Sequence, residues 1–202
     1  MTPRAHALPL LLVAASLTAC SSAPTAAPAA ATPPGSTRAP NDAMAKVNTV
    51  AEDRDVWQQL LTDHAKIRRT VVHRQEGERG IVEATTESDD PVVAARIRNH
   101  AVAMQNRMKA GAQVRVWDEV FEELFRRHDL VTLELTMTEK GVKIVEWSTD
   151  PETIALLRSH AMGVSDFVRE GHEAGARATP RLPVGAPLPP PEVADGASTP
   201  AR

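Results

Sequence analysis

The sequence has a single cysteine, Cys20, and no tyrosine. With one cysteine, no disulfide can form within the chain. No stretch is apolar over the roughly 20 residues that a membrane-spanning helix needs. We also find no Gly-x-Ser-x-Gly motif, no phosphate-binding glycine loop and no Cys-x-x-Cys pair. These absences argue against an enzyme, because each of the missing motifs positions the groups that a common reaction needs.

The central region, 42–177, carries an excess of negative charge. It contains 19 Lys and Arg residues against 24 Asp and Glu residues, a net charge of −5 with histidine neutral. The basic residues form no stripe along the sequence. Because nucleic-acid binding depends on neutralising phosphates with Lys and Arg, we predict that the protein does not bind nucleic acid.

The N-terminal segment has the three parts of a secretory signal. Arg4 is the basic flank, residues 7–17 form a short apolar core, and small residues lead to Cys20. The stretch Leu17-Thr18-Ala19-Cys20 resembles the cleavage site of bacterial lipoprotein precursors. This resemblance covers only the N-terminal segment. It implies that 1–19 are a signal peptide and that Cys20 becomes an acylated N-terminus.

Acylation of Cys20 would anchor the protein in a membrane of the cell envelope. Each buried CH₂ of an acyl chain contributes about 0.8 kcal/mol, so several chains on one cysteine give stable anchoring. In an organism with two membranes, Ser21 favours the outer membrane, with the protein facing the periplasm, since an aspartate at that position resembles an inner-membrane retention signal. The expected partners are the membrane itself and, as a further candidate, an envelope protein.

Two segments are too poor in large apolar residues to bury a core. Residues 20–41 are mainly Ala, Pro, Ser and Thr, and they are predicted to form a disordered tether. Residues 178–202 are rich in Pro and Ala, with three consecutive prolines at 189–191, and are predicted to form a disordered tail. Between them, 42–177 is long enough for one folded domain.

The domain carries the signs of a tandem duplication. Asp55-Val56-Trp57 recurs as Glu119-Val120-Phe121 at an offset of 64 residues. Asp90-Pro91 recurs as Asp150-Pro151 at an offset of 60 residues. The smaller second offset is explained if the first copy has four extra residues between its two strands. Repeats at a constant offset determine the architecture, so they guide the fold prediction.

Each repeat, at about 46–111 and 112–172, is predicted to be a helix–strand–strand–helix unit. The alternation of apolar and polar residues over 131–137 is typical of a half-buried strand. Asp90-Pro91 and Asp150-Pro151 suit helix starts, because Asp accepts hydrogen bonds from free N–H groups and Pro has none to leave unpaired. We therefore predict an α+β fold in which antiparallel hairpins pack with helices under pseudo-two-fold symmetry. Whether the hairpins join edge to edge stays open.

Four histidines occupy matched positions in the two repeats: His64 with His128, and His100 with His160. All four lie on or beside the apolar stripe of a predicted helix. Neutral imidazole binds zinc, copper and haem iron, and Met104, one turn from His100, adds a thioether that suits Cu(I). A histidine on an apolar face is more often a core residue whose ring nitrogens are hydrogen-bonded. The sequence leaves both interpretations open.

Ser88-Asp89-Asp90-Pro91 and Ser148-Thr149-Asp150-Pro151 resemble paired segments of uncharacterised exported bacterial proteins, and this resemblance implies no function. We expect a membrane-anchored envelope lipoprotein that serves as a non-catalytic structural or interaction module. The alternative is a carrier or sensor of copper, zinc or haem that uses His64, His100, His128 and His160. No catalytic residue and no firm cofactor is predicted.

The lipid anchor can be tested by replacing Cys20 with Ala in the full-length precursor. Because the sulfur carries the acyl group, the wild-type protein should partition into the detergent phase and Cys20→Ala into the aqueous phase. Ser21→Ala is the matched control, since it leaves the sulfur in place, and it should behave as the wild type. Recovery of the wild-type protein in the aqueous phase would contradict the anchor.

Overall fold

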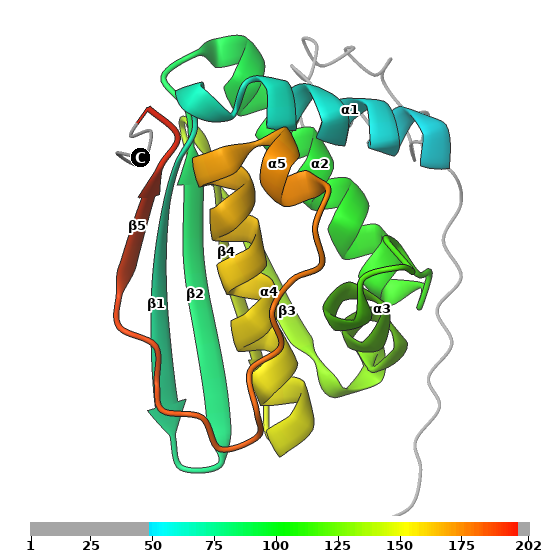
Figure 1. The fold of residues 1–202 in the computed structure, drawn as a ribbon, viewed down its shortest axis with the longest axis vertical. Helices are drawn as coiled ribbons and strands as arrows, with labels where there is room; N and C mark the ends of the chain where they lie inside the picture. Colours follow the sequence, from blue (N-terminus) through cyan, green and yellow to red (C-terminus); the bar gives the residue numbers. More distant parts are fainter. Residues whose placement is uncertain (1–48, 198–202) are drawn as a thin grey trace, which may run out of the picture. The chain divides into compact units, whose positions relative to one another are not determined.

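The computed structural model describes residues 49–197. The signal peptide, Cys20 and the tether predicted for 1–41 lie outside the described residues, as do 198–202. All described residues belong to one unit, Ala45–Arg202. Figure 1 shows a curved sheet whose inner face is covered by helices. The α+β fold class predicted from the sequence is confirmed.

The elements follow one another in the same order in each half of the described chain: a helix, a 3-10 turn, two strands and a helix. The first half consists of α1 (Val50–Thr62), a turn at His64–Lys66, β1 (Arg68–Glu76), β2 (Arg79–Glu87) and α2 (Pro91–Lys109). The second half consists of α3 (Glu119–Arg126), a turn at His128–Leu130, β3 (Thr132–Met137), β4 (Gly141–Ser148) and α4 (Pro151–Glu170). A short helix, α5 (His172–Gly175), and a last strand, β5 (Glu192–Asp195), follow.

The five strands form one antiparallel sheet in the order β3-β4-β2-β1-β5. The two hairpins join edge to edge, because β2 pairs with β4 from Gly80 opposite Ser148 to Glu87 opposite Gly141. Gly141 permits this pairing, since a Cβ there would overlap the main-chain carbonyl oxygen of Thr86. The pairing of β2 with β4 thus makes one continuous sheet of the two hairpins, which the sequence alone did not decide.

The two long helices begin where the Asp-Pro pairs predicted. In α2, Asp90 accepts hydrogen bonds from the N–H groups of Val92 and Val93, at 2.9 and 3.4 Å. In α4, Asp150 accepts from the N–H and the hydroxyl of Thr153, at 2.8 and 2.7 Å. These caps satisfy N–H groups that have no partner within the helix. Both helices lie against the inner face of the sheet.

The inner face of the sheet contains charged groups as well as apolar ones. On β1, Arg69, Val71 and His73 are buried and alternate with exposed residues, as the two-residue period of a strand requires. On β4, Glu146 is buried on the same face. The apolar residues beside them form the core with residues of α3 and α4, among them Val82, Ala84, Leu124, Leu156 and Leu157.

The C-terminal segment differs from the prediction of a disordered tail over 178–202. After α5 the chain runs past α4 and returns to the sheet, where β5 pairs with β1 (Figure 1). Ala194 is fully buried, and the N–H of Gly196 donates to the carbonyl oxygen of Ile67 at 3.0 Å. The free edge of β1 supplies backbone partners to this segment. Composition alone could not predict this, since the pairing uses main-chain groups of a distant strand.

Candidate functional site

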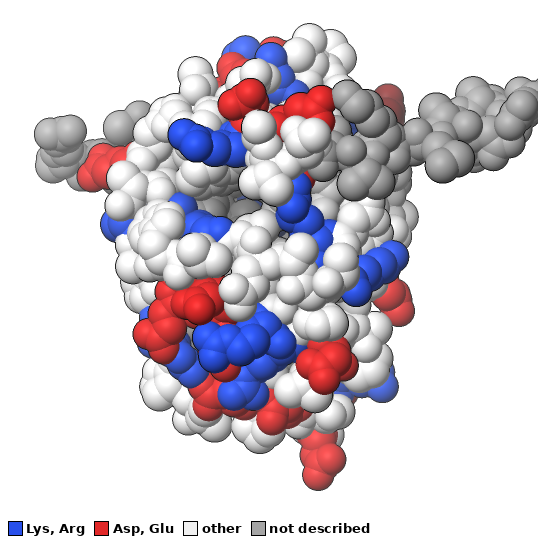
Figure 2. Space-filling model, turned by 90° about the vertical axis from the view of Figure 1, so that its right-hand side faces the viewer, with Lys and Arg blue, Asp and Glu red and all other residues white. Residues whose placement is uncertain are grey.

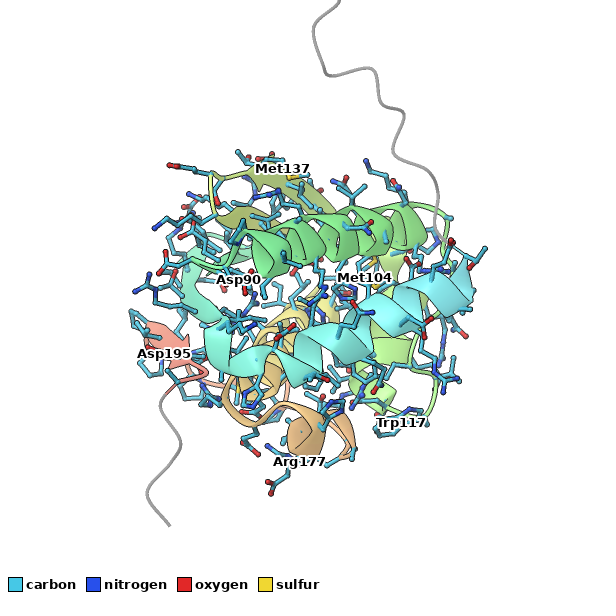
Figure 3. The ribbon with its side chains drawn as sticks, turned by 90° about the horizontal axis from the view of Figure 1, so that it is seen from above. Asp90, Met104, Trp117, Met137, Arg177 and Asp195 are labelled. Carbon is cyan, nitrogen blue, oxygen red and sulfur yellow. The ribbon has the colours of Figure 1, made fainter. Side chains whose placement is uncertain are left out.

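A cavity of about 670 Å³ lies between the inner face of the sheet and helices α1, α2 and α4. Its volume is within the range of small-molecule sites, roughly 300–1,000 Å³. Apolar side chains from all of these elements line it, including Leu61, Ile97, Met104, Ile144, Val164 and Phe167. Viewed from above, Met104 of α2 lies between α2 and α1 (Figure 3). The interior of the domain is therefore hollow and mainly apolar at this place.

The cavity opens between the start of α1 and the loop 113–117. The lining residues there are exposed, with Val50 at 72% and Trp117 at 56%. Figure 2 shows a hollow on the face that carries α1, α2 and α3, with Lys and Arg side chains beside it. A small molecule could enter by this opening.

Arg115 fixes the loop at the opening. Its guanidinium donates to the carbonyl oxygens of Gly175 and Arg177, at 2.8 and 2.7 Å, and its Nε donates to Asp118 at 3.1 Å. The group also lies over the ring of Trp117, 4.1 Å from the centroid. Cation–π contacts of this kind stabilise by roughly 0.5–1 kcal/mol at exposed sites. The rim of the cavity is therefore held to the last residue of α5 and to the segment after it.

The floor of the cavity carries a buried arginine. Arg69 is only 6% exposed, and its Nη1 donates to the hydroxyl of Thr86, its cross-strand neighbour, at 2.7 Å. Its Nε has no hydrogen-bond partner. Burial lowers the pKa of Arg69 to about 10, against the opposing effect of the Glu146 and Glu192 charges. The group stays protonated at neutral pH.

Glu146 is the second charged group on the floor. It is 7% exposed and lines the cavity from β4. Burial raises the pKa of Glu146 to about 7, and the nearby Arg69 charge limits the rise. Burial in an apolar site disfavours the ionised carboxylate. Glu146 therefore keeps its proton to a higher pH than an exposed glutamate does.

The structure brings two of the four predicted histidines to this cavity. His100 of α2 and His160 of α4 both line it, and the Nδ1 atom of each is buried without a hydrogen-bond partner. The Nδ1 of His160 lies 4.0 Å from Oε2 of Glu146, and its ring stacks edge-on against Phe121, with 4.9 Å between centroids. Burial lowers the pKa of both histidines to about 4. Both rings are thus neutral at pH 7.

His64 and His128 lie elsewhere. The Nδ1 of His64 donates to the carbonyl oxygen of Val168 at 2.9 Å, and its ring packs against Gly171 at the end of α4. The ring of His128 packs against Gly111 at the end of α2. Within 49–197, no group of three or more His, Cys, Asp or Glu side chains is placed to hold a metal ion. The four matched histidines therefore do not form one cluster.

Arg69 and Glu146 were not identified from the sequence. A signal existed for Arg69, since the alternation of Arg69, Val71 and His73 along one strand places all three side chains on one face. That face proved to be the buried one. For Glu146 no such signal existed, because its strand alternates less regularly and its burial depends on the pairing of β4 with β2.

No model of a protein family, no curated protein and no solved structure matches this chain. In the described part of the chain, no helix has the length and apolarity to cross a bilayer. The function is therefore inferred from the chemistry of the cavity.

Glu146→Gln tests the raised pKa of this carboxyl. Because the folded pKa of about 7 lies above the ordinary 4.5, the folded state holds a proton that the unfolded state releases between these values. This contribution to stability falls as pH rises from about 4.5 to about 7. The amide stays neutral, so the variant should gain stability relative to the wild type between pH 5 and pH 8.

The measurement is the urea unfolding midpoint of both proteins at pH 5 and pH 8. Comparing them at each pH cancels the titration of His100 and His160, whose lowered pKa values act in the opposite direction. Glu134→Gln, at an exposed position of β3, is the matched control. A stability difference that is the same at both pH values would show that the pKa of Glu146 is not raised.

Proposed function

We propose that this protein is a non-catalytic, lipid-anchored binding protein of the cell envelope, which holds a mainly apolar small molecule in its cavity. The cavity itself is the observation that carries the proposal. Protein interiors are normally packed to the density of organic crystals, with few voids larger than a water molecule. An apolar hollow of about 670 Å³ that opens to the surface departs from this rule and suits a ligand.

The proposal keeps the sequence-based expectations for the N-terminal segment. The signal peptide, the acylated Cys20 and the tether would bring the domain to the envelope, at the outer membrane facing the periplasm if the organism has two membranes. The described chain starts at Thr49, and the next residue, Val50, lines the opening of the cavity. We propose that an apolar ligand reaches this opening from a membrane or from an envelope partner.

We also propose that the domain arose by tandem duplication, with repeats at about 46–111 and 112–172 related by a pseudo-two-fold axis. The equal order of elements in the two halves supports this. So does a reciprocal contact: His64 packs against Gly171, and its matched residue His128 packs against Gly111. A two-fold axis produces such exchanged pairs. The matched pair His100 and His160 lines a single cavity, as residues on opposite sides of an axis would.

Filling the cavity should abolish binding. We expect Val164→Trp, in the mature protein, to weaken binding of the neutral fluorescent probe N-phenyl-1-naphthylamine at least about tenfold, because the indole would occupy the ligand volume. Val193→Trp, on an exposed position of β5, is the matched control and should bind as the wild type does. The unfolding midpoint of each variant checks that it is folded. Equal binding by folded Val164→Trp and by the wild type would argue against the cavity as the site.

A carrier or sensor of haem is the second candidate function. The observation that favours it is that His100 of α2 and His160 of α4 line one mainly apolar cavity, both neutral and both with an unpartnered Nδ1. Haem iron takes one or two axial ligands from the protein, so two imidazoles suffice. Copper or zinc is less well supported, because the described residues supply no group of three ligands.

Titration with haemin separates this candidate from the first. If haem binds, the wild-type Soret band should shift to the position typical of imidazole ligation, and His100→Ala/His160→Ala should lose the shift. His64→Ala/His128→Ala is the matched control, because it removes the two histidines that lie outside the cavity, and it should keep the shift. Identical spectra for all three proteins would reject histidine ligation of haem.

A further inference from the structure

Arg69 is a buried cation without an ion-pair partner. In residues 49–197, no carboxylate oxygen lies within 4.0 Å of its guanidinium, and its hydrogen bond to Thr86 leaves Nε without a partner. Taking a charge out of water is expensive unless an opposite charge or hydrogen bonds compensate it. Arg69 lines the cavity, so a bound ligand could supply the missing partner.

The charged groups that line the cavity favour an anion. Four arginines and two carboxylates are among the lining residues. Arg107 is paired with Asp53 and Arg115 with Asp118, so the comparison that remains is Arg54 and Arg69 against Glu146. One carboxylate, Asp53, is already bound to Arg107, whose Nε donates to it at 2.8 Å. The other, Glu146, has its pKa raised by burial, so its neutral form is accessible near neutral pH. In its neutral form Glu146 does not repel an anion and can donate a hydrogen bond to it. The remaining wall is mainly apolar, with the neutral rings of His100 and His160 among its polar groups.

We propose that the ligand is an amphiphile with one carboxylate, and that Arg69 on the cavity floor binds this carboxylate while the apolar wall holds the hydrocarbon part. This inference rests on the proposed function, since it identifies the polar group of the molecule that the cavity would hold. A guanidinium presents its N–H groups in a planar fork that matches the two oxygens of a carboxylate. A long-chain fatty acid is the simplest molecule of this class.

The test uses three probes of equal chain length: dodecanoate, 1-dodecanol and dodecylamine. Each displaces N-phenyl-1-naphthylamine from the mature protein at pH 7. For the wild type, dodecanoate should bind about tenfold or more tightly than either other probe, because only it carries the negative charge that Arg69 lacks. Tightest binding by dodecylamine would overturn the proposal and would point to Glu146 as the site of a cationic head group.

Arg69→Met removes the charge and keeps much of the side-chain volume. It should weaken binding of dodecanoate about tenfold or more and leave binding of 1-dodecanol unchanged. Arg69→Lys keeps the charge without the fork and should bind dodecanoate with intermediate affinity. Arg68→Met is the matched control, since Arg68 is the preceding residue of β1 and is exposed on the opposite face, and it should bind all three probes as the wild type does.

The outcomes separate the two proposals. If Arg69→Met weakens 1-dodecanol and dodecanoate equally, Arg69 shapes the cavity without recognising the head group, and this inference is wrong while the proposed function stands. If the wild type binds neither the fluorescent probe nor any dodecyl compound, the proposed function itself fails. A merely structural role also predicts a lower unfolding midpoint for Arg69→Met. We expect the midpoint to stay the same or rise, because the variant no longer buries an unpaired charge.

Discussion

The pairing of β2 with β4 is the contact on which the rest of the structure depends. Eight residue pairs, from Gly80 opposite Ser148 to Glu87 opposite Gly141, join two hairpins into a single sheet. The register of this pairing turns Glu146 to the same face as Arg69. Side chains alternate between the two faces of a sheet, so a slip of one residue would turn Glu146 out to solvent. The floor of the cavity is thus a product of strand register.

The cavity holds several groups that would weaken an ordinary core. Arg69 and Glu146 are buried, His100 and His160 are half-buried, and in each case burial opposes the charged form. The unpartnered ring nitrogens of His100 and His160 and the unpartnered Nε of Arg69 add to the free-energy cost of burying these groups. Natural proteins depart from good packing and polar satisfaction mostly at functional sites. Among the described residues, Asp53, Arg69, His100 and His160 have an unpartnered buried polar atom and line this one hollow, whereas His73, Arg158 and Ser165 have such atoms outside its lining. The hollow itself, with these groups in its wall, is the main reason to assign the function to this place.

Segments that are far apart in the sequence hold the cavity in shape. The Asp53 carboxylate on α1 binds Arg107 on α2, which ties together the two helices beside the opening. Arg115 connects the loop at the opening to the carbonyl oxygens of Gly175 and Arg177. At the other side, β5 covers the edge of β1, and Arg169 of α4 pairs with Glu192 of β5. The C-terminal segment therefore contributes to the opening as well as to the sheet.

The α+β class, the order of helices and strands, and the starts of α2 and α4 at Asp90 and Asp150 followed from the sequence alone. These features depend on local preferences, namely the period of apolar residues and the hydrogen bonds that Asp offers to a helix start. The matched pair His100 and His160 was also visible in the sequence as a candidate site.

Tertiary structure decided which of the four histidines line the cavity, on which face of the sheet Arg69 and Glu146 lie, and whether 192–195 forms a strand. Each of these depends on a partner far away in the sequence: α4 for His100, β2 for Glu146, and β1 for β5. The free-energy cost of burying Arg69 depends on the groups around it, and the main-chain pairing of β5 depends on β1. Only the folded chain brings these groups together. Local sequence patterns therefore determined the elements, whereas long-range packing made the cavity.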